Sequence, residues 1–247
     1  MKNIHTHLVF ISVILYIVSL NQLFLKMKRI FFFFAATLIS VSAFAQKHKV
    51  SLETEYGKIV IMLYDGTPQN TNNMVKLAKE HYYDSTLFHR IITNFMIQGG
   101  DPQSKHAKPG EMLGNGDLGY KVPAEINDSF FHKRGALGVA RENTPDKSGS
   151  ACQFYIVQGK KCTDAELDNI TQRTGRKFSP SQREVYKTIG GTPHLDGNYT
   201  VYGEVLEGMD VVDKIAAQPR DANDRPNKDI QIIHLKLLKK KKRFLFF

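Results

Sequence analysis

The chain has 247 residues, 42% of them hydrophobic, with 16 Phe, 10 Tyr and no Trp, enough for one domain with its own core and an extension at one end. Its formal net charge is +10, but residues 1–49 and 236–247 each hold six Lys or Arg and no acid, which leaves 22 basic against 24 acidic residues between them. Because a nucleic-acid surface needs positive charge on the fold itself, this distribution argues against DNA or RNA as a partner.

The segment 27–45 has the three parts of a secretory signal peptide. A short basic start at 27–29 precedes an apolar stretch at 30–41, and the small residues Ala43 and Ala45 stand at the −3 and −1 positions of a cleavage site. We therefore expect cleavage after Ala45 and a protein that works outside the cytoplasm, in the periplasm or an equivalent bacterial compartment.

Residues 1–26 form an upstream apolar extension that has two interpretations. The stretch from Leu8 to Leu25 is about the minimum length for a membrane-spanning helix. Alternatively, Met27 is the true start and the extension is translated upstream sequence, which we prefer because a signal peptide is most easily recognised at the extreme N-terminus. Membrane association is expected only if these apolar segments are retained.

Short runs of strand-like residues dominate the chain after residue 49. The dipeptide at Tyr56 and Gly57 predicts a hairpin between the first two. The expected strands lie within residues 50–57, 58–64, 87–92, 95–100, 121–126, 135–140, 152–157, 200–206 and 230–238. Many short strands with glycine-rich turns and only two framework helices favour a closed antiparallel β-barrel.

Helical patterns occur in three places. Residues 68–82 begin with proline and repeat apolar residues at helical spacing, and residues 209–217 predict a second short helix. The polar stretch 163–190 opens with Thr163 as a plausible N-cap and predicts a surface insertion of one or two helices. The basic tail at 239–247 is expected to be disordered or weakly attracted to membranes.

Two other features indicate what the chain does not contain. The two cysteines, Cys152 and Cys162, have no metal-ligand spacing with any histidine, and strand-like residues separate them, so we expect two free thiols. Residues 114–119 spell GxGxxG but lead into an extended, proline-containing segment rather than a helix, so they predict a glycine-rich loop and not a dinucleotide site.

The run FHRIITNFMIQGGD, from Phe88 to Asp101, resembles the central signature of the cyclophilins almost throughout. The runs GALGVAR at 135–141 and HLDGNYTVYGEVLEGMDVVDKI at 194–215 resemble later segments of that family in the same order. The resemblance covers about 50–237 apart from the insertion. It implies an eight-stranded barrel capped by two helices, and isomerisation of the peptide bond before proline.

The resemblance also implies a role for individual residues. Arg90 falls on the catalytic arginine, which would stabilise the twisted amide. The residues expected to bind the proline ring and the peptide backbone are Phe95, Met96, Gln98, Ala140, Arg141, Gln153, Tyr155, Leu195 and Tyr199. His89 is interpreted as a structural histidine, because isomerisation needs no general base. No metal or cofactor is expected, since the reaction breaks no bond.

Four positions depart from what many members of the family have. His194 stands in place of a tryptophan, Arg141 of an asparagine, Tyr155 of a phenylalanine and Tyr199 of a histidine. Such changes are typical of the bacterial branch, and the first puts cyclosporin sensitivity in question.

The sequence thus predicts a monomeric peptidyl-prolyl isomerase that acts on proline-containing polypeptides during the folding of exported proteins. Two alternatives stay open. One is a binding module that docks proline-containing segments with incidental catalysis, against which the intact Arg90 argues. The other is a membrane-tethered protein that retains residues 1–26.

Overall fold

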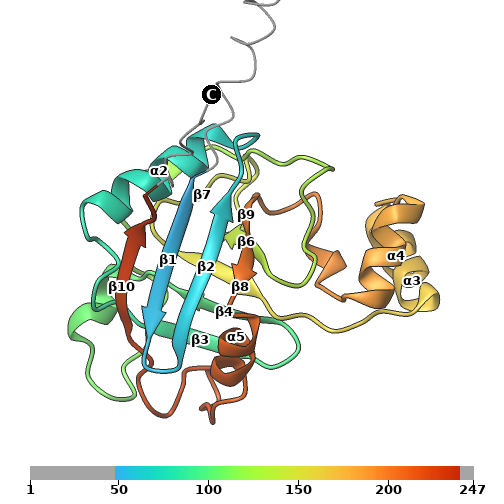
Figure 1. Cartoon of the computed structure of the whole chain (residues 1–247). Helices are drawn as coiled ribbons and strands as arrows, with labels where there is room; N and C mark the ends of the chain where they lie inside the picture. Colours follow the sequence, from blue (N-terminus) through green and yellow to red (C-terminus); the bar gives the residue numbers. More distant parts are fainter. Residues whose placement is uncertain (1–47, 240–247) are drawn as a thin grey trace, which may run out of the picture. The chain divides into compact units, whose positions relative to one another are not determined.

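The computed structural model describes residues 48–239, and the expected signal peptide at 27–45, the extension at 1–26 and residues 240–247 of the tail lie outside them. Eight antiparallel strands form one curled sheet in the order β10-β1-β2-β9-β6-β8-β4-β3 (Figure 1). These strands are β1 (Lys49–Thr54), β2 (Gly57–Leu63), β3 (Phe88–Ile92), β4 (Met96–Gly99), β6 (Ala136–Val139), β8 (Phe154–Val157), β9 (Val201–Glu207) and β10 (Ile232–Leu237).

The expected closure of the barrel is not confirmed. The edge strands β3 and β10 are joined by one isolated antiparallel bridge between Leu87 and Gln231, and the backbone N–H of Phe88 donates to the carbonyl of Ile230 at 2.9 Å. No continuous ladder joins these two strands, which stand at opposite ends of the strand order. The sheet is therefore curled into a half-barrel, with one isolated bridge between the segments next to its edge strands.

One expected strand lies outside this sheet. Of residues 121–126, only β5 (Lys121–Val122) is extended and paired, and it pairs with β7 (Gly149–Ser150) in a separate two-stranded sheet. The proline at position 123 follows directly and offers no backbone N–H, so the pairing stops there.

The helices confirm the predicted pattern. They are α2 (Pro68–Lys79), α3 (Asp164–Thr174), α4 (Pro180–Thr188) and α5 (Met209–Ala216), with short 3₁₀ turns η1 (Pro102–His106) and η2 (Pro193–Leu195). Thr163 caps α3 in a capping box with Glu166, as its position predicted. No helix among residues 48–239 combines the length and the apolar composition needed to cross a membrane.

The alternation of side chains along β4, β6 and β8 gives the sheet two apolar faces. Ile97, Leu137 and Ile156 point inward and join the main core, which α2 and α5 also cover. Their neighbours Met96 and Tyr155 point outward and belong to a second cluster. The outward face of a strand is usually polar. An apolar outward face therefore marks a surface where the sheet can bind another molecule.

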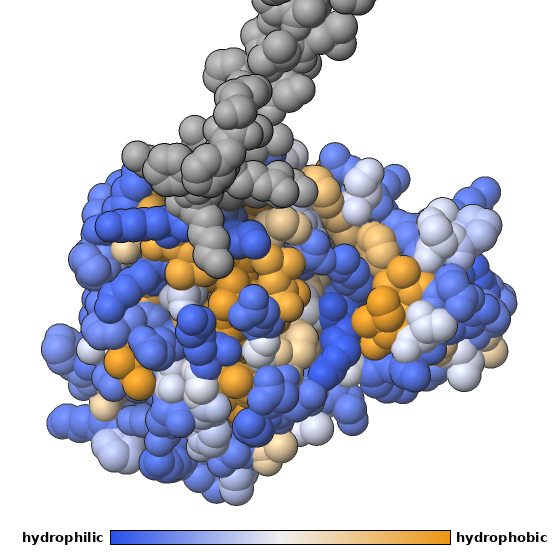
Figure 2. All heavy atoms as spheres, in the orientation of Figure 1, coloured by the Kyte–Doolittle hydropathy of each residue, from blue (hydrophilic) through white to orange (hydrophobic). Residues whose placement is uncertain are grey.

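The insertion forms a small helical lobe, residues 163–190, with its own core. Leu167 and Tyr186 are fully buried there, beside Phe178 and Cys162. Figure 2 shows the lobe standing off the sheet, with apolar residues gathered on its side nearer the sheet. Both cysteines are free, as expected.

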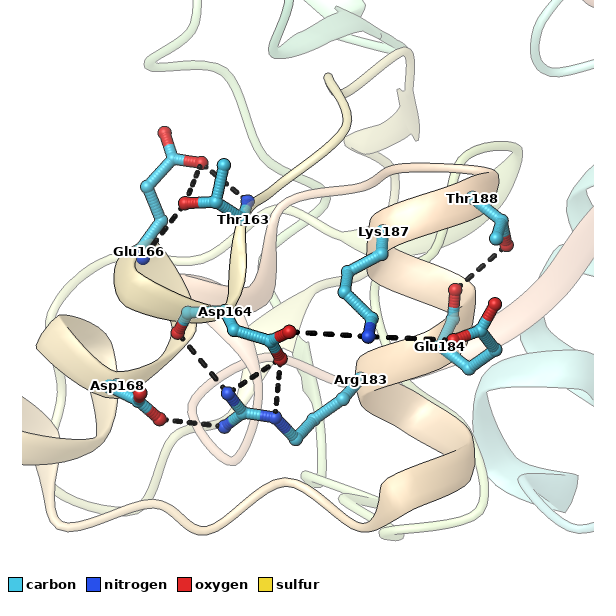
Figure 3. A network of polar contacts seen from close by, with 8 residues as sticks. All are labelled: Thr163, Asp164, Glu166, Asp168, Arg183, Glu184, Lys187 and Thr188. Carbon is cyan, nitrogen blue, oxygen red and sulfur yellow. Dashed lines mark hydrogen bonds and ion pairs between the residues drawn. The ribbon is translucent and has the colours of Figure 1, made fainter.

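Ion pairs join the outer faces of α3 and α4 (Figure 3). The guanidinium of Arg183 contacts Asp164 at 2.7 Å and Asp168 at 2.8 Å, and the ammonium of Lys187 contacts Asp164 at 3.2 Å. These contacts hold the two helices side by side.

Candidate active site

A cavity of about 320 Å³ opens on the outward face of β3, β4 and β8. Nine of the ten residues predicted to act on substrate line it: Arg90, Phe95, Met96, Gln98, Ala140, Arg141, Tyr155, Leu195 and Tyr199. The tenth, Gln153, lies in an adjoining recess of about 90 Å³. Residues that are up to about a hundred positions apart in sequence thus meet at one site.

The floor of the cavity is apolar. Met96 is 1% exposed and Tyr155 is 4% exposed, and the partly buried Phe95 and Leu195 pack against the same cluster. The Tyr155 ring lies directly over Gly138, its cross-strand partner, where a Cβ would overlap the ring. A glycine at this position is therefore required for the ring to lie flat in the floor.

The hydroxyl of Tyr155 is anchored beneath the cavity. It lies 2.8 Å from Nε2 of His132, whose Nδ1 lies 2.7 Å from the carboxylate of Asp196. Because a carboxylate accepts, Nδ1 carries the proton; in the neutral ring, Nε2 then accepts from the Tyr155 hydroxyl. Tyr186 of α4 donates to the other oxygen of Asp196 at 2.6 Å. A buried hydrogen-bonded chain thus connects the helical lobe to the cavity floor.

Arg90 provides the cation at the rim of the cavity. Its side chain is 41% exposed, and its Nε lies 3.6 Å from the carboxylate of Asp224, which also contacts Nε of Arg220 at 3.3 Å. Within residues 48–239, the terminal amino groups of Arg90 donate no hydrogen bond to another residue. Asp224 thus orients the guanidinium while its terminal N–H groups stay available for a ligand.

Amide side chains form the polar wall. Nε2 of Gln98 donates to Oε1 of Gln153 at 3.1 Å, and Nε2 of Gln153 donates to the carbonyls of Gly114 at 2.9 Å and Gly116 at 2.8 Å. The donors of Gln153 are therefore engaged within the protein, and its geometry favours holding Gln98 and the glycine-rich loop in place. A direct contact of Gln153 with substrate stays a prediction.

Arg141 and Tyr199 close the opposite wall. Nε of Arg141 donates to the carbonyl of Asn198 at 2.8 Å, and its guanidinium lies 4.8 Å from the centre of the Tyr199 ring. The Tyr199 ring meets the Tyr155 ring edge to face at 6.2 Å. This cation–π contact fixes both side chains, so the wall is formed before any ligand arrives.

Two histidines border the site. Burial lowers the pKa of His89 to about 4, so its ring is neutral near pH 7, which agrees with a structural role. His194, the residue in place of tryptophan, is exposed and stacks on Phe95 with ring centres 5.5 Å apart.

The sequence did not place the glycine-rich loop at the site. Leu113, Gly114 and Asn115 line the cavity, and the loop is extended rather than helical where it ends, as predicted. The carboxylate of Asp101 accepts from the backbone N–H groups of Gly114 and Gly116, which folds the loop back over β4. The glycine-rich spacing predicted a loop. Its position at the cavity depends on contacts with Asp101 and Gln153, which the spacing does not reveal.

The types of group that line the cavity determine what it can hold. In the part of the chain that the structure describes, no three His, Cys, Asp or Glu side chains are grouped to bind a metal ion. An apolar floor, a row of fixed polar groups and one free-ended cation suit a ligand with an apolar ring flanked by peptide groups.

Comparison with known proteins agrees with this geometry. The family described as cyclophilin type peptidyl-prolyl cis-trans isomerase/CLD matches residues 49–237. The chain therefore belongs to the cyclophilin-type peptidyl-prolyl cis-trans isomerase family.

Two bacterial relatives are named as putative peptidyl-prolyl cis-trans isomerases. A putative peptidyl-prolyl cis-trans isomerase of Staphylococcus haemolyticus is 35% identical over 185 residues, 74% of this chain and 88% of that protein. A putative bifunctional phosphatase/peptidyl-prolyl cis-trans isomerase of Streptococcus pyogenes serotype M6 is 37% identical over 187 residues. That match covers 74% of this chain and only 37% of the streptococcal protein.

Solved structures show the same fold. A cyclophilin type peptidyl-prolyl cis-trans isomerase of Cryptosporidium parvum superposes with a TM-score of 0.59 at 23% identity, covering 79% of this chain and 99% of that one. A second structure of that protein, determined in the presence of the dipeptide Ala-Pro, gives a TM-score of 0.56 at 24% identity and covers 78% of this chain and 99% of that one.

Proposed function

We propose that this protein accelerates the cis–trans isomerisation of Xaa–Pro peptide bonds in exported polypeptides, with Arg90 as the catalytic residue. The observation that carries the proposal is the position of Arg90, a cation with free terminal N–H groups at the rim of an apolar cavity. A module that only bound proline would gain little from that cation. The Ala-Pro dipeptide named for the Cryptosporidium structure supports a proline-containing ligand for this fold.

The physical problem is the barrier of about 20 kcal/mol to rotation of the C–N bond, which comes from amide resonance. When the bond twists, resonance is lost and the proline nitrogen regains a lone pair that can accept a hydrogen bond. In the proposed mechanism, a terminal N–H of Arg90 donates to that nitrogen only in the twisted state. An interaction made in that state alone lowers the barrier.

The other residues hold the substrate still while the bond turns. Phe95, Met96 and Leu195 enclose the pyrrolidine ring, and Gln98 with the backbone at Ala140 holds the neighbouring peptide group. No proton is transferred, so the neutral His89 takes no part in the reaction.

The test is the rate of cis–trans exchange in a short Ala–Pro peptide, followed by NMR line shape with the purified protein. We expect acceleration by wild type and a loss of about 100-fold in Arg90→Ala, while Arg183→Ala on the outer face of the lobe keeps full activity. Binding without acceleration by wild type would replace the isomerase with a binding module.

The exported role depends on residues 27–45, which have the pattern of a signal peptide. N-terminal sequencing of protein recovered from cells is expected to begin at Gln46, in the extracytoplasmic fraction. A product that retains residues 1–26 in the membrane fraction would instead establish a tethered isomerase.

A further inference from the structure

A second hollow of about 540 Å³ lies between the helical lobe and the sheet, next to the proline cavity. Asn94 and His194 line this hollow, while their chain neighbours Phe95 and Leu195 line the cavity. The stacked rings of Phe95 and His194, 5.5 Å apart, form the wall between the two. The hollow thus lies directly beside the site, across this wall.

The cavity has a different neighbour at its other end. The recess of about 90 Å³ that contains Gln153 shares Gly114, Asn115, Ala140 and Arg141 with the proline cavity. The three hollows therefore follow one another, with the proline cavity in the middle. If the peptide segment on one side of the proline is held at Ala140, the segment on the other side of the proline lies next to the lobe hollow.

The chemistry of the lobe hollow suits a peptide that carries a negative charge. The lobe contributes the exposed amides of Asn169 and Gln172, which can hydrogen-bond a peptide backbone. Lys160 is paired with Glu166 at 2.8 Å, so these two charges compensate each other. Arg173 is exposed and makes no ion pair within residues 48–239. One uncompensated positive charge therefore faces the hollow.

We propose that this hollow is a subsite for the substrate segment on the far side of the proline from Ala140, and that Arg173 makes it select a carboxylate in that segment. The inference rests on the proposed isomerase function and specifies its substrate. An extended peptide advances about 3.3 Å per residue, so an acidic residue within about three positions of the proline would reach the hollow.

The lobe can act as part of the site because its position is fixed before a ligand arrives. Tyr186 of α4 donates to the buried Asp196, which comes directly after η2, so a buried hydrogen bond ties the lobe to the segment that borders the cavity. A wall that is already ordered loses little entropy when a peptide binds against it.

The experiment compares a blocked Ala–Pro core peptide with versions extended by three residues, at one end or the other, that contain either Glu or Lys. Exchange is followed by NMR with the whole protein. We expect a preference for Glu at one end of the core peptide and none at the other. At the preferred end, kcat/KM should be about threefold higher for the Glu extension than for the Lys extension, the size expected for one solvent-exposed ion pair. The gain should shrink as salt is added.

Charge reversal provides the decisive variants. Arg173→Glu should reverse the preference, so that the Lys extension becomes the better substrate, while Lys79→Glu on the remote helix α2 should change nothing. Because reversal requires a folded lobe, it cannot arise from unfolding. An Arg173→Glu variant that leaves the preference as in wild type would overturn the inference, as would equal rates for all extensions. Failure of wild type to accelerate even the core peptide would instead refute the proposed function.

Discussion

Two carboxylate centres, one on the helical lobe and one at its base, make similar contacts in opposite environments. Asp196, at the base of the lobe, has a side chain that is 1% exposed and accepts from His132 and Tyr186. Asp164, on its outer face, is 54% exposed and pairs with Arg183 and Lys187. The polar contacts of these two carboxylates do not by themselves distinguish them.

The difference in burial decides what each centre contributes. A solvent-exposed ion pair exchanges contacts with water for contacts with protein, and the net gain is small. A buried carboxylate that loses its partners, or buried donors that lose their carboxylate, cannot recover those contacts from water. We therefore expect the base of the lobe, rather than its visibly charged face, to determine its stability and its position beside the proline cavity.

The largest expected effect is at Asp196. Asp196→Ala leaves the Nδ1–H of His132 and the hydroxyl of Tyr186 buried without an acceptor, so it should lower the free energy of unfolding by about 3–5 kcal/mol. Urea denaturation measures this. Asp196→Asn retains one acceptor oxygen and should cost clearly less. A loss in the alanine variant no larger than that of an average surface substitution would contradict the comparison.

His89 extends the comparison to a buried group whose ring nitrogens make no side-chain hydrogen bond within residues 48–239. Burial lowers its pKa from 6.5 to about 4, so between these pH values the unfolded chain binds a proton that the folded protein does not. The free energy of unfolding should therefore fall as pH drops from 6.5 towards 4, by about 3 kcal/mol in total. His89→Gln should remove this part of the pH dependence, measured by denaturation at each pH.

The exposed His106 is the control for that measurement. His106→Gln should leave the slope between pH 4 and 6.5 as in wild type. If His89→Gln kept the wild-type slope, the buried imidazole would not be its source.

Tyr155 tests the end of the buried chain that reaches the cavity. Tyr155→Phe leaves Nε2 of His132 without its donor, which should cost about 1–3 kcal/mol of stability. Because the ring remains in the apolar floor over Gly138, the rate of Ala–Pro exchange should stay within about twofold of wild type. A large loss of activity without a loss of stability would instead give the hydroxyl a direct role in catalysis.

Much of the fold could be predicted because local patterns and the fold agree. The strand-like runs at 95–100 and 152–157 predicted β4 and β8, and Thr163 marked the start of α3. Four of the predicted site residues, Arg90, Phe95, Met96 and Gln98, line one cavity because the signature from Phe88 to Asp101 makes both β3 and β4.

What could not be predicted depends on partners far apart in the chain. Closure of the sheet depends on whether β3 and β10 remain in register at the seam, which no local pattern reports. Residues 121–126 were predicted as a barrel strand, yet Lys121–Val122 pair with Gly149–Ser150 in a separate sheet. The glycine-rich loop reaches the cavity through Asp101 and Gln153. Each outcome depends on a tertiary contact that competes with the local preference.

The smallest expected effect is at Arg183, whose contacts are the most conspicuous in Figure 3. Arg183→Ala removes its pairs with Asp164 and Asp168, whose side chains are 54% and 59% exposed, so the midpoint of thermal unfolding should hardly move. Lys187 keeps Asp164 in contact with α4, which reduces the effect further. Measured beside Asp196→Ala, this variant should show the smaller loss of stability. Equal losses of stability at the two centres would mean that burial does not distinguish them, and that the outer ion pairs position the lobe after all.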